Sequence, residues 1–425
     1  MANEDLRFRA ATFDDLERVL EIHLTAFPDE RTAEVRRRNF TANRFGSLDD
    51  LVVAERGDEI VGQAFLFPLE AWFGRRATKI GAIASLAIAA EARGQGIGTA
   101  LLHHLHVASD VRGDALTMLY AFRQRFYARQ GYGSSSSRRR LMIDPASIPT
   151  SWRALARGRV RRARGEDKDA IRAAYERAAI KTSGWLTRSE TFWERHLARE
   201  RRHFLVADRP AREGGGMSGY VAFELTQDEP HAATTLTVDE IAADDDTTRL
   251  ALLGALAAMR DQVVELELEV DANDPIEHAL VDSDGRRFGN GAVEHDLGLV
   301  VGGPMVRVED VTRAIEARGY AADGTLDVVV HAGGERSERG VAEGDGAADE
   351  IAVSVRVGDG RAEVSAARGA AGALRTTKAG LASLLYGALR PSDAVRMGLA
   401  DADARTLARA DGIFAMAAVA PVDPF

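Results

Sequence analysis

Residues 83–102 read IASLAIAAEARGQGIGTALL, and this stretch decides the fold of the chain. Residues 83–88 are apolar on both faces, which predicts a strand buried inside a sheet. From Thr99 onward apolar residues recur with the helical period, so a helix is expected to follow. The intervening glycine loop, residues 93–98, reads RGQGIG, and its glycines allow a tight turn that exposes successive backbone N–H groups. Because the loop opens a helix, it is expected to bind an anion such as a pyrophosphate.

The glycine loop is also compatible with other interpretations. A P-loop ends in Gly-Lys-Ser/Thr, but Gly98 is followed by Thr99 and Ala100, which excludes that motif. A dinucleotide-binding fingerprint spaces its glycines as GxGxxG in the first βα turn, whereas this loop is GxGxG and begins at residue 93. An ordinary tight turn between a strand and a helix remains an alternative on the loop alone.

The surrounding sequence resembles the GNAT superfamily of acetyltransferases. Its motif A is a buried strand, then Arg/Gln-x-x-Gly-x-Gly/Ala, then a helix, and residues 83–102 are similar to it. Residues 126–133 read FYARQGYG, which is similar to the FYxxxGYG ending of a GNAT domain. The resemblance implies that residues 1–150 form a GNAT acetyltransferase domain that binds acetyl-CoA.

Other elements expected of this first domain can be placed on the sequence. They are strands at residues 7–10, 51–55 and 60–67, and a helix at 13–26. A last strand is expected at residues 140–143. The preceding arginines at 138–140 fit a solvated strand edge or, alternatively, a patch for an acidic substrate.

From residue 160 the order of elements begins again with strand, helices, hairpin, strand, helix and strand. The predicted segments are 160–164, 167–180, 189–200, 203–208, 219–226, 233–242, 246–261 and 263–270. After Ile241 the sequence continues Ala-Ala-Asp-Asp-Asp, without a glycine loop, and these carboxylates would repel a pyrophosphate. Residues 151–303 are therefore expected to form a degenerate GNAT-like domain that does not bind the cofactor.

A third domain is expected at residues 304–425. It is predicted to contain helices at 308–318, 378–386 and 392–399, and strands at 324–330, 351–357 and 361–366. This layout resembles a sterol-carrier-like fold, from which lipid binding does not follow, since a fold alone does not carry function. The fold class is thus α+β: two tandem GNAT-like mixed-sheet domains, the second degenerate, then a sterol-carrier-like α/β domain.

Composition limits the functions that are compatible with the chain. With 425 residues it is too long for one core, and about two or three domains are expected. The absence of cysteine excludes disulfides, thiolate metal sites and a cysteinyl acyl-enzyme, so acyl transfer needs another nucleophile or passes directly between substrates. A net charge of −10 argues against a nucleic-acid partner. With no apolar stretch long enough for a membrane span and no signal segment, a soluble cytoplasmic protein is expected. No metal is predicted.

The order of the three domains resembles the enhanced-intracellular-survival (Eis) family of N-acetyltransferases. The resemblance implies an acetyl-CoA co-substrate, a small-molecule or lysine-like amine acceptor, which the sequence does not identify, and a homo-oligomer, commonly a hexamer. By resemblance, the residues assigned to acetyl-CoA are Leu86, Ala87, Ile88, Arg93, Gly94, Gln95, Gly96, Ile97, Gly98, Thr99, Phe122 and Arg123. Phe122 departs from the small polar residue usual in the family.

Acetyl transfer to an amine requires an acid near the sulfur and a base near the amine. The resemblance assigns the acid to Tyr127 and the base to the terminal carboxylate on Phe425. The alternatives are that Tyr127 is a core aromatic residue and that the terminus frays in solvent. Tyr132 is expected to pack, and the histidines at 103, 104 and 106 are expected to pack or face solvent.

Two function classes follow. The first is an acetyl-CoA-dependent N-acetyltransferase that moves acetyl to a primary amine by direct transfer in a ternary complex. The second is a non-catalytic CoA-binding sensor or assembly protein whose acceptor pocket has decayed, which the altered segment at Ala121 and Phe122 leaves open.

Overall fold

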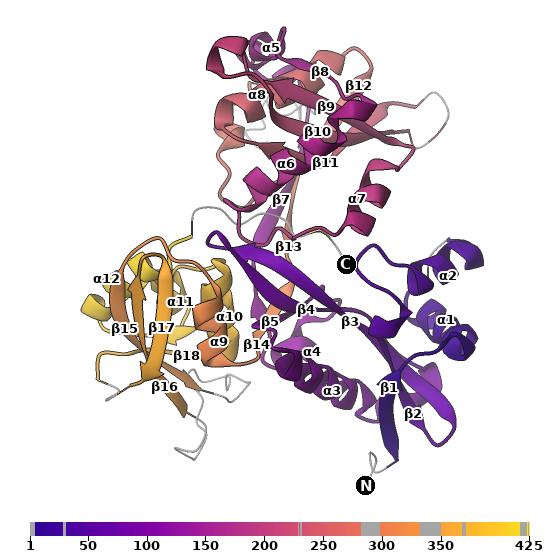
Figure 1. Ribbon diagram of the computed structural model, residues 1–425, viewed down its shortest axis with the longest axis vertical. Helices are drawn as coiled ribbons and strands as arrows, with labels where there is room; N and C mark the ends of the chain where they lie inside the picture. The colour runs from indigo at the N-terminus through magenta and orange to yellow at the C-terminus, as the bar shows by residue number, and fades with distance from the viewer. Residues whose placement is uncertain are drawn as a thin grey trace, which may run out of the picture. The chain divides into compact units, whose positions relative to one another are not determined.

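The computed structural model forms three β-sheets within its described residues, two of seven strands and one of five (Figure 1). The described residues are 5–28, 31–227, 229, 232–281, 298–331, 350–367, 371–416, 423 and 425. The sheets divide between two compact units. One holds the described residues up to Ser136, those from Gly303 onward and Phe425; the other runs from Ser137 to Gly302. The predicted α+β class is confirmed.

The first sheet has the strand order β1-β2-β3-β4-β5-β14-β6. Its strands are β1 (Leu6–Ala10), β2 (Leu51–Arg56), β3 (Glu59–Phe73), β4 (Arg76–Ile88), β5 (Leu116–Leu119), β14 (Met305–Val308) and β6 (Gly133–Ser134). Neighbouring strands are antiparallel except for β4 and β5, which are parallel. This mixed sheet contains β4, the strand that leads into the glycine loop.

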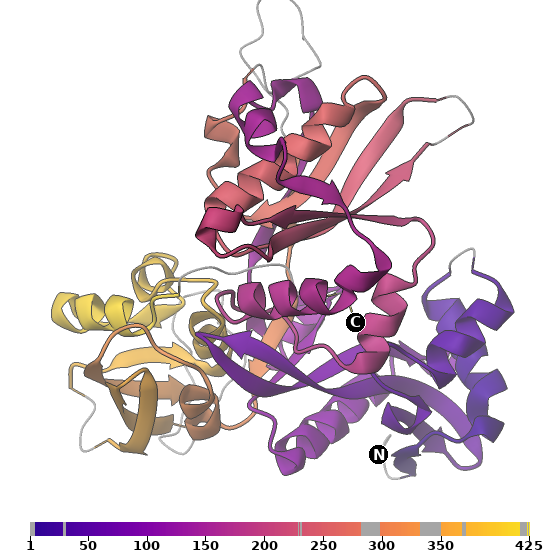
Figure 2. The same ribbon diagram turned by 45° about the horizontal axis from the view of Figure 1, so that its top comes forward.

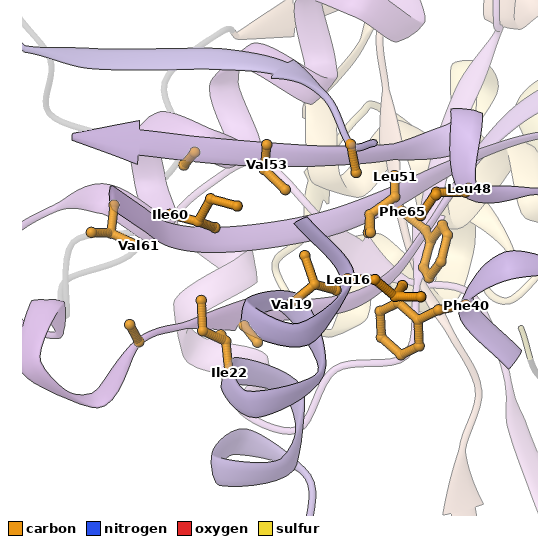
Figure 3. Packing of buried hydrophobic residues seen from close by; sticks show 14 of the residues in the cluster. Leu16, Val19, Ile22, Phe40, Leu48, Leu51, Val53, Ile60, Val61 and Phe65 are labelled. Carbon is orange, nitrogen blue, oxygen red and sulfur yellow. The ribbon is translucent and has the colours of Figure 1, made fainter. Parts of the chain in front are cut away.

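Alternation along β3 supplies a core on each face of the first sheet. Phe65 lies on the face covered by α1 (Leu16–Ala26) and α2 (Ala33–Thr41). Figure 3 shows Val19 and Ile22 of α1 directed at this face. Leu66 lies on the opposite face, covered by α3 (Ile97–Arg112) and α4 (Gln124–Ala128). The two helical layers fix the ends of β4 and β5, where the site is built.

Two strands are exchanged between the first and second sheets, since the strand at Ser137–Ile143 joins the second sheet and β14 joins the first. The strand expected to close the first domain is β7 (Ser137–Ile143), and it pairs with β12 (Val263–Asp271) and β13 (Gly298–Gly302) of the second sheet. Arg138 and Arg140 of β7 form ion pairs with Glu269 of β12 at 2.6 and 2.8 Å. These arginines therefore lie on an interior strand and not on a solvated edge.

In the first sheet the place between β5 and β6 is taken by β14. A helix was expected from Val308, but Val306 and Val308 are fully buried strand residues. The helix α9 (Val311–Ala317) starts later, because the carboxylate of Asp310 accepts a hydrogen bond from the backbone N–H of Arg313 at 2.7 Å.

The second sheet repeats the strand order of the first, as β8-β9-β10-β11-β12-β7-β13. Its chain runs from magenta to salmon in Figure 2. The remaining strands are β8 (Val160–Arg162), β9 (Arg202–Asp208), β10 (Met217–Thr226) and β11 (Thr234–Ala243). The accompanying helices are α5 (Thr150–Ala156), α6 (Lys168–Ala179), α7 (Glu190–Leu197) and α8 (Asp246–Leu256). The predicted GNAT-like repeat is confirmed.

The third sheet has the order β17-β16-β15-β18-β19. Its strands are β15 (Gly324–His331), β16 (Glu350–Gly358), β17 (Arg361–Ala366), β18 (Leu374–Thr377) and β19 (Ala400–Asp401). The helices packed with it are α9, α10 (Lys378–Tyr386), α11 (Pro391–Arg396) and α12 (Ala404–Ile413). None of the helices in the described ranges has both the length and the apolar character needed to cross a bilayer.

The turn between β3 and β4 holds the third domain against the first. The N–H of Gly319 donates to the carbonyl of Phe73 at 3.0 Å, and the ring of Phe73 lies 5.3 Å from that of Tyr386. Gly74 has φ +56, and a Cβ there would lie 2.2 Å from the carbonyl oxygen of Gly319. Only glycine permits this approach. This contact attaches the third domain to the first domain, against whose core Phe425 also packs.

Candidate active site

β4 and β5 separate at the point where the glycine loop begins. Their last paired residues are Ile83 and Leu119, whereas β4 stays paired with β3 as far as Ile88. A bulge lies in this part of β4, where the register shifts between Gln63 and Phe65 of β3 and Ser85 has φ +51. Among the described residues, the β5-facing edge of β4 beyond Ile83 has no paired strand. Its backbone groups can therefore bond to a ligand.

The glycine loop presents an uncapped helix N-terminus. Gly96 is the N-cap of α3, and no described side chain caps the helix there. Gly94 and Gly96 have φ +76 and +80, and a Cβ at either position would meet no atom within 4 Å. The side chain of Arg56 donates to Gln95 Oε1 at 2.6 Å, and Gln95 donates to the carbonyl of Glu91 at 3.2 Å, which stabilises the loop. Open space in front of free amides fits a diphosphate.

Tyr127 lies on α4 and is almost completely buried, with 3% of its surface exposed. The rings of Phe122, Phe126 and Tyr132 surround it with centroid distances of 6.2, 5.0 and 5.9 Å. Burial raises the pKa of Tyr127 to about 12, because the phenolate would lose its hydration. No described residue forms a hydrogen bond with its hydroxyl. Tyr127 is thus a protonated phenol available to a ligand.

Tyr132 and the histidines of α3 have structural partners. The hydroxyl of Tyr132 lies 2.9 Å from Nε2 of His106 and 3.2 Å from Oγ1 of Thr117. Burial, with smaller effects of nearby cations, lowers the pKa of His106 to about 3, so this imidazole is neutral. His104 stacks on Phe8 at 4.7 Å. Tyr132, His104 and His106 therefore pack as expected, and His103 is exposed.

Phe425 lies on the first domain. Its ring centroid is 5.4 Å from that of Tyr120 and 6.2 Å from that of Phe45, and it packs against the core below α1. Tyr120 directly follows β5. The described end of the chain is therefore in the same domain as Tyr127, beside the strand that separates from β4.

Three family models match successive parts of the chain. Residues 7–135 and 184–308 each match a model of the acetyltransferase (GNAT) domain, and residues 311–422 match the sterol carrier protein domain. The N-acetyltransferases Eis of Mycobacterium bovis and Mycobacterium tuberculosis are 27% identical to this chain over 369 residues, which cover 84% of either partner. This chain belongs to the Eis-like N-acetyltransferases of the GNAT superfamily.

Solved structures share the whole fold of this Eis-like chain. The GCN5-related N-acetyltransferase from Kribbella flavida has a TM-score of 0.77 and 24% identity, covering 99% of this chain and 98% of that one. Eis1 from Mycobacterium abscessus has a TM-score of 0.72 and 20% identity with the same coverage. At these identities the likeness shows the fold alone.

The second domain of this Eis-like chain has its anion-binding position filled by its own side chains. Asp245 is the N-cap of α8, and its carboxylate accepts from the N–H of Thr248 at 2.7 Å. Asp244 pairs with Arg177 at 2.9 Å and with Arg209. The helix N-terminus that the glycine loop leaves uncapped in the first domain is here capped by the carboxylate of Asp245.

Phe122 and Arg123 lie on the surface next to Tyr127. Phe122 is 68% exposed, and Arg123 is exposed at the start of α4. Their contact with acetyl-CoA remains a prediction from the Eis-like resemblance.

Sequence reasoning missed Phe45 and Tyr120, which contact Phe425, because nothing in the local pattern marks an aromatic residue as a partner of the chain end.

Proposed function

We propose that this chain transfers acetyl from acetyl-CoA to a primary amine, directly and within a ternary complex. The observation that carries the proposal is the unpaired edge of β4 running into an uncapped, glycine-lined helix N-terminus, in the same domain as the buried phenol of Tyr127. Acetyl-CoA, when bound, supplies the acetyl group as a reactive thioester.

Acetyl-CoA would be held by backbone groups. The edge at Leu86, Ala87 and Ile88 would bond the amides of the pantetheine arm, as a neighbouring strand would. The glycine loop and Thr99 would hold the diphosphate through first-turn N–H groups and the positive end of the α3 dipole. Phe122 and Arg123 would flank the same molecule at the start of α4.

The reaction joins an amine nitrogen to the acetyl group and releases the thiol of coenzyme A. One proton must leave the nitrogen and one must reach the sulfur. Tyr127 is suited to donate, since its raised pKa keeps the phenol protonated at neutral pH. The terminal carboxylate on Phe425 is the proposed acceptor of the amine proton, and the packing of the Phe425 ring on Tyr120 supports this role.

The acceptor is proposed to be a small-molecule or lysine-like amine, because the aromatic faces of Phe45, Tyr120 and Phe425 suit a cationic group before it loses its proton. Direct transfer agrees with a chain that has no cysteine to carry an acetyl group. A homohexamer is proposed from the Eis-like resemblance and is measurable by light scattering.

Thiol release tests the proposal. The full-length protein is incubated with acetyl-CoA and a panel of primary amines, and free thiol and acetylated product are both measured. Tyr127→Phe should keep acetyl-CoA affinity while turnover falls about a hundredfold or more, the usual contribution of a general acid. Full turnover in this variant would show that Tyr127 is structural. Acetyl-CoA binding without thiol release on any amine would instead favour the CoA-binding sensor or assembly protein.

A further inference from the structure

The second domain contains a cavity that the acetyl-transfer site does not use. Its volume is about 540 Å³, within the range of small-molecule sites. The cavity lies where β8, the start of α6 and the adjoining parts of β9 and β10 meet. None of its lining residues comes from β11, β12 or α8, the elements that correspond to the cofactor-binding strand pair and helix of the first domain. It is therefore not the remnant of a cofactor site.

Positive charge gathers at this cavity. Among the described residues its lining includes the cations Arg162, Arg164, Lys168 and Arg202 and no aspartate or glutamate, although the whole chain has a net charge of −10. Two of these cations, Arg162 and Lys168, are exposed and form no ion pair with any described residue. Uncompensated cations at the mouth of a cavity attract and retain an anion.

The other lining cations are partly neutralised or held in place. Arg202 is fixed by Asp239 at 2.8 Å and by Nδ1 of His196 at 2.8 Å, and Arg164 lies 3.6 Å from the exposed Glu166. Arg162 and Lys168 are therefore the groups left to meet the charge of a ligand.

The rest of the cavity wall is apolar. It is formed by Ile171, Leu197, Phe204, Leu205, Phe223, Leu225 and Met259. The ring of His203 packs on that of Phe223 in a tilted arrangement and extends this wall, with ring centroids 5.5 Å apart and an angle of 36° between the planes. Leu225 is 39% exposed, so a ligand can reach the wall from solvent. An inorganic anion would leave these side chains in contact with water, whereas an apolar body would cover them.

We propose that this cavity binds an amphipathic carboxylate, with the head group at Arg162 and Lys168 and an acyl or aryl body against Phe223 and Leu225. The N–H of Arg164 is not free to bind the head group, because it already donates to Asp167 at 2.6 Å. The carboxylate head group would thus bind two side-chain cations, and the apolar body of the ligand would pack on the apolar wall.

Calorimetric titration of the full-length protein with octanoate tests this assignment. Excess CoA is present, so that the acyl chain does not enter the first domain. Octanoate should bind at least about tenfold more tightly than hexanoate, since two methylene groups are buried. Acetate, octylammonium and inorganic phosphate should not bind measurably. Equal binding of octylammonium, or phosphate binding as tightly as octanoate, would overturn the proposal.

Charge-reversal variants locate the site. Lys168→Glu should weaken octanoate binding at least tenfold, and Leu225→Glu should do the same by placing a carboxylate on the apolar wall. Arg212→Glu is the matched control, since Arg212 is an exposed residue of the same domain outside the cavity. If Leu225→Glu fails to fold, Lys168→Glu alone decides, because Lys168 has no ion-pair partner among the described residues to lose. Wild-type affinity in Lys168→Glu would refute the site.

Discussion

Gly96 allows a sharp test of the glycine loop, because the same helix offers a matched position at its other end. Gly96 is the N-cap of α3 and Gly113 is its C-cap, with φ +80 and +84. An added Cβ would meet no atom within 4 Å at either position. Gly96→Val and Gly113→Val therefore impose the same backbone strain in the same open surroundings, at opposite ends of one helix.

The two variants should differ in cofactor binding and not in stability. A non-glycine residue in the left-handed region costs roughly 1–2 kcal/mol, so each variant should lose about that much unfolding free energy. In Gly96→Val the side chain also enters the space in front of the first-turn amides. Losing one hydrogen bond to a charged group there costs about 1.5–3 kcal/mol, which corresponds to a roughly 10- to 150-fold weaker Kd for acetyl-CoA.

Calorimetry with acetyl-CoA measures the binding effect, and denaturant titration measures the stability of both variants. Gly113→Val should bind acetyl-CoA like the wild type. An unchanged Kd in Gly96→Val, or an equal loss of affinity in both variants, would show that the loop is only a tight turn and would remove the cofactor assignment.

Three further predictions concern other parts of the chain. Adding a few residues after Phe425 should leave folding and acetyl-CoA binding intact but lower turnover about a hundredfold or more. The same residues added at the N-terminus should leave turnover unchanged. Equal rates of the two variants at saturating substrate would contradict a base at Phe425. Because His106 has a folded-state pKa of about 3 against an ordinary 6.5, only the unfolded state gains a proton between these values. Unfolding free energy should therefore fall by up to about 5 kcal/mol as pH drops from 6.5 to 3. His106→Gln should flatten that dependence in denaturant titrations, and an unchanged pH slope would argue against a neutral His106. Asp245→Ala removes the α8 cap and should lower unfolding free energy by about 1 kcal/mol without changing acetyl-CoA affinity, so a change in affinity would place the cofactor in the second domain.

The elements nearest the glycine loop could be predicted because their signals are local. A buried strand, three glycines and a helical period specify β4, the loop and α3 without information from other parts of the chain. The FYARQGYG segment likewise marked Tyr127, which the structure places on the short helix α4, where burial keeps its phenol protonated.

Strand partners could not be predicted in the same way, since a strand pattern does not say which sheet the strand joins. One signal was present: three consecutive arginines in β7 face a strand, β12, that carries Glu265, Glu267 and Glu269. Opposite charges on paired strands stabilise that pairing. For Phe425 no such signal exists, because its contacts with Phe45 and Tyr120 depend on the tertiary fold.

The exchange of β7 and β14 constrains how the protein is made. During synthesis, a ribosome translates residues 305–308 only after it has completed all of the second domain, yet these residues fill the place between β5 and β6. The nascent first sheet must therefore remain unfinished while the second domain emerges, with β5 exposed as an unpaired edge. A message cut short before that point would yield no complete acetyltransferase sheet, so the catalytic domain that comes first in the gene is among the last to close.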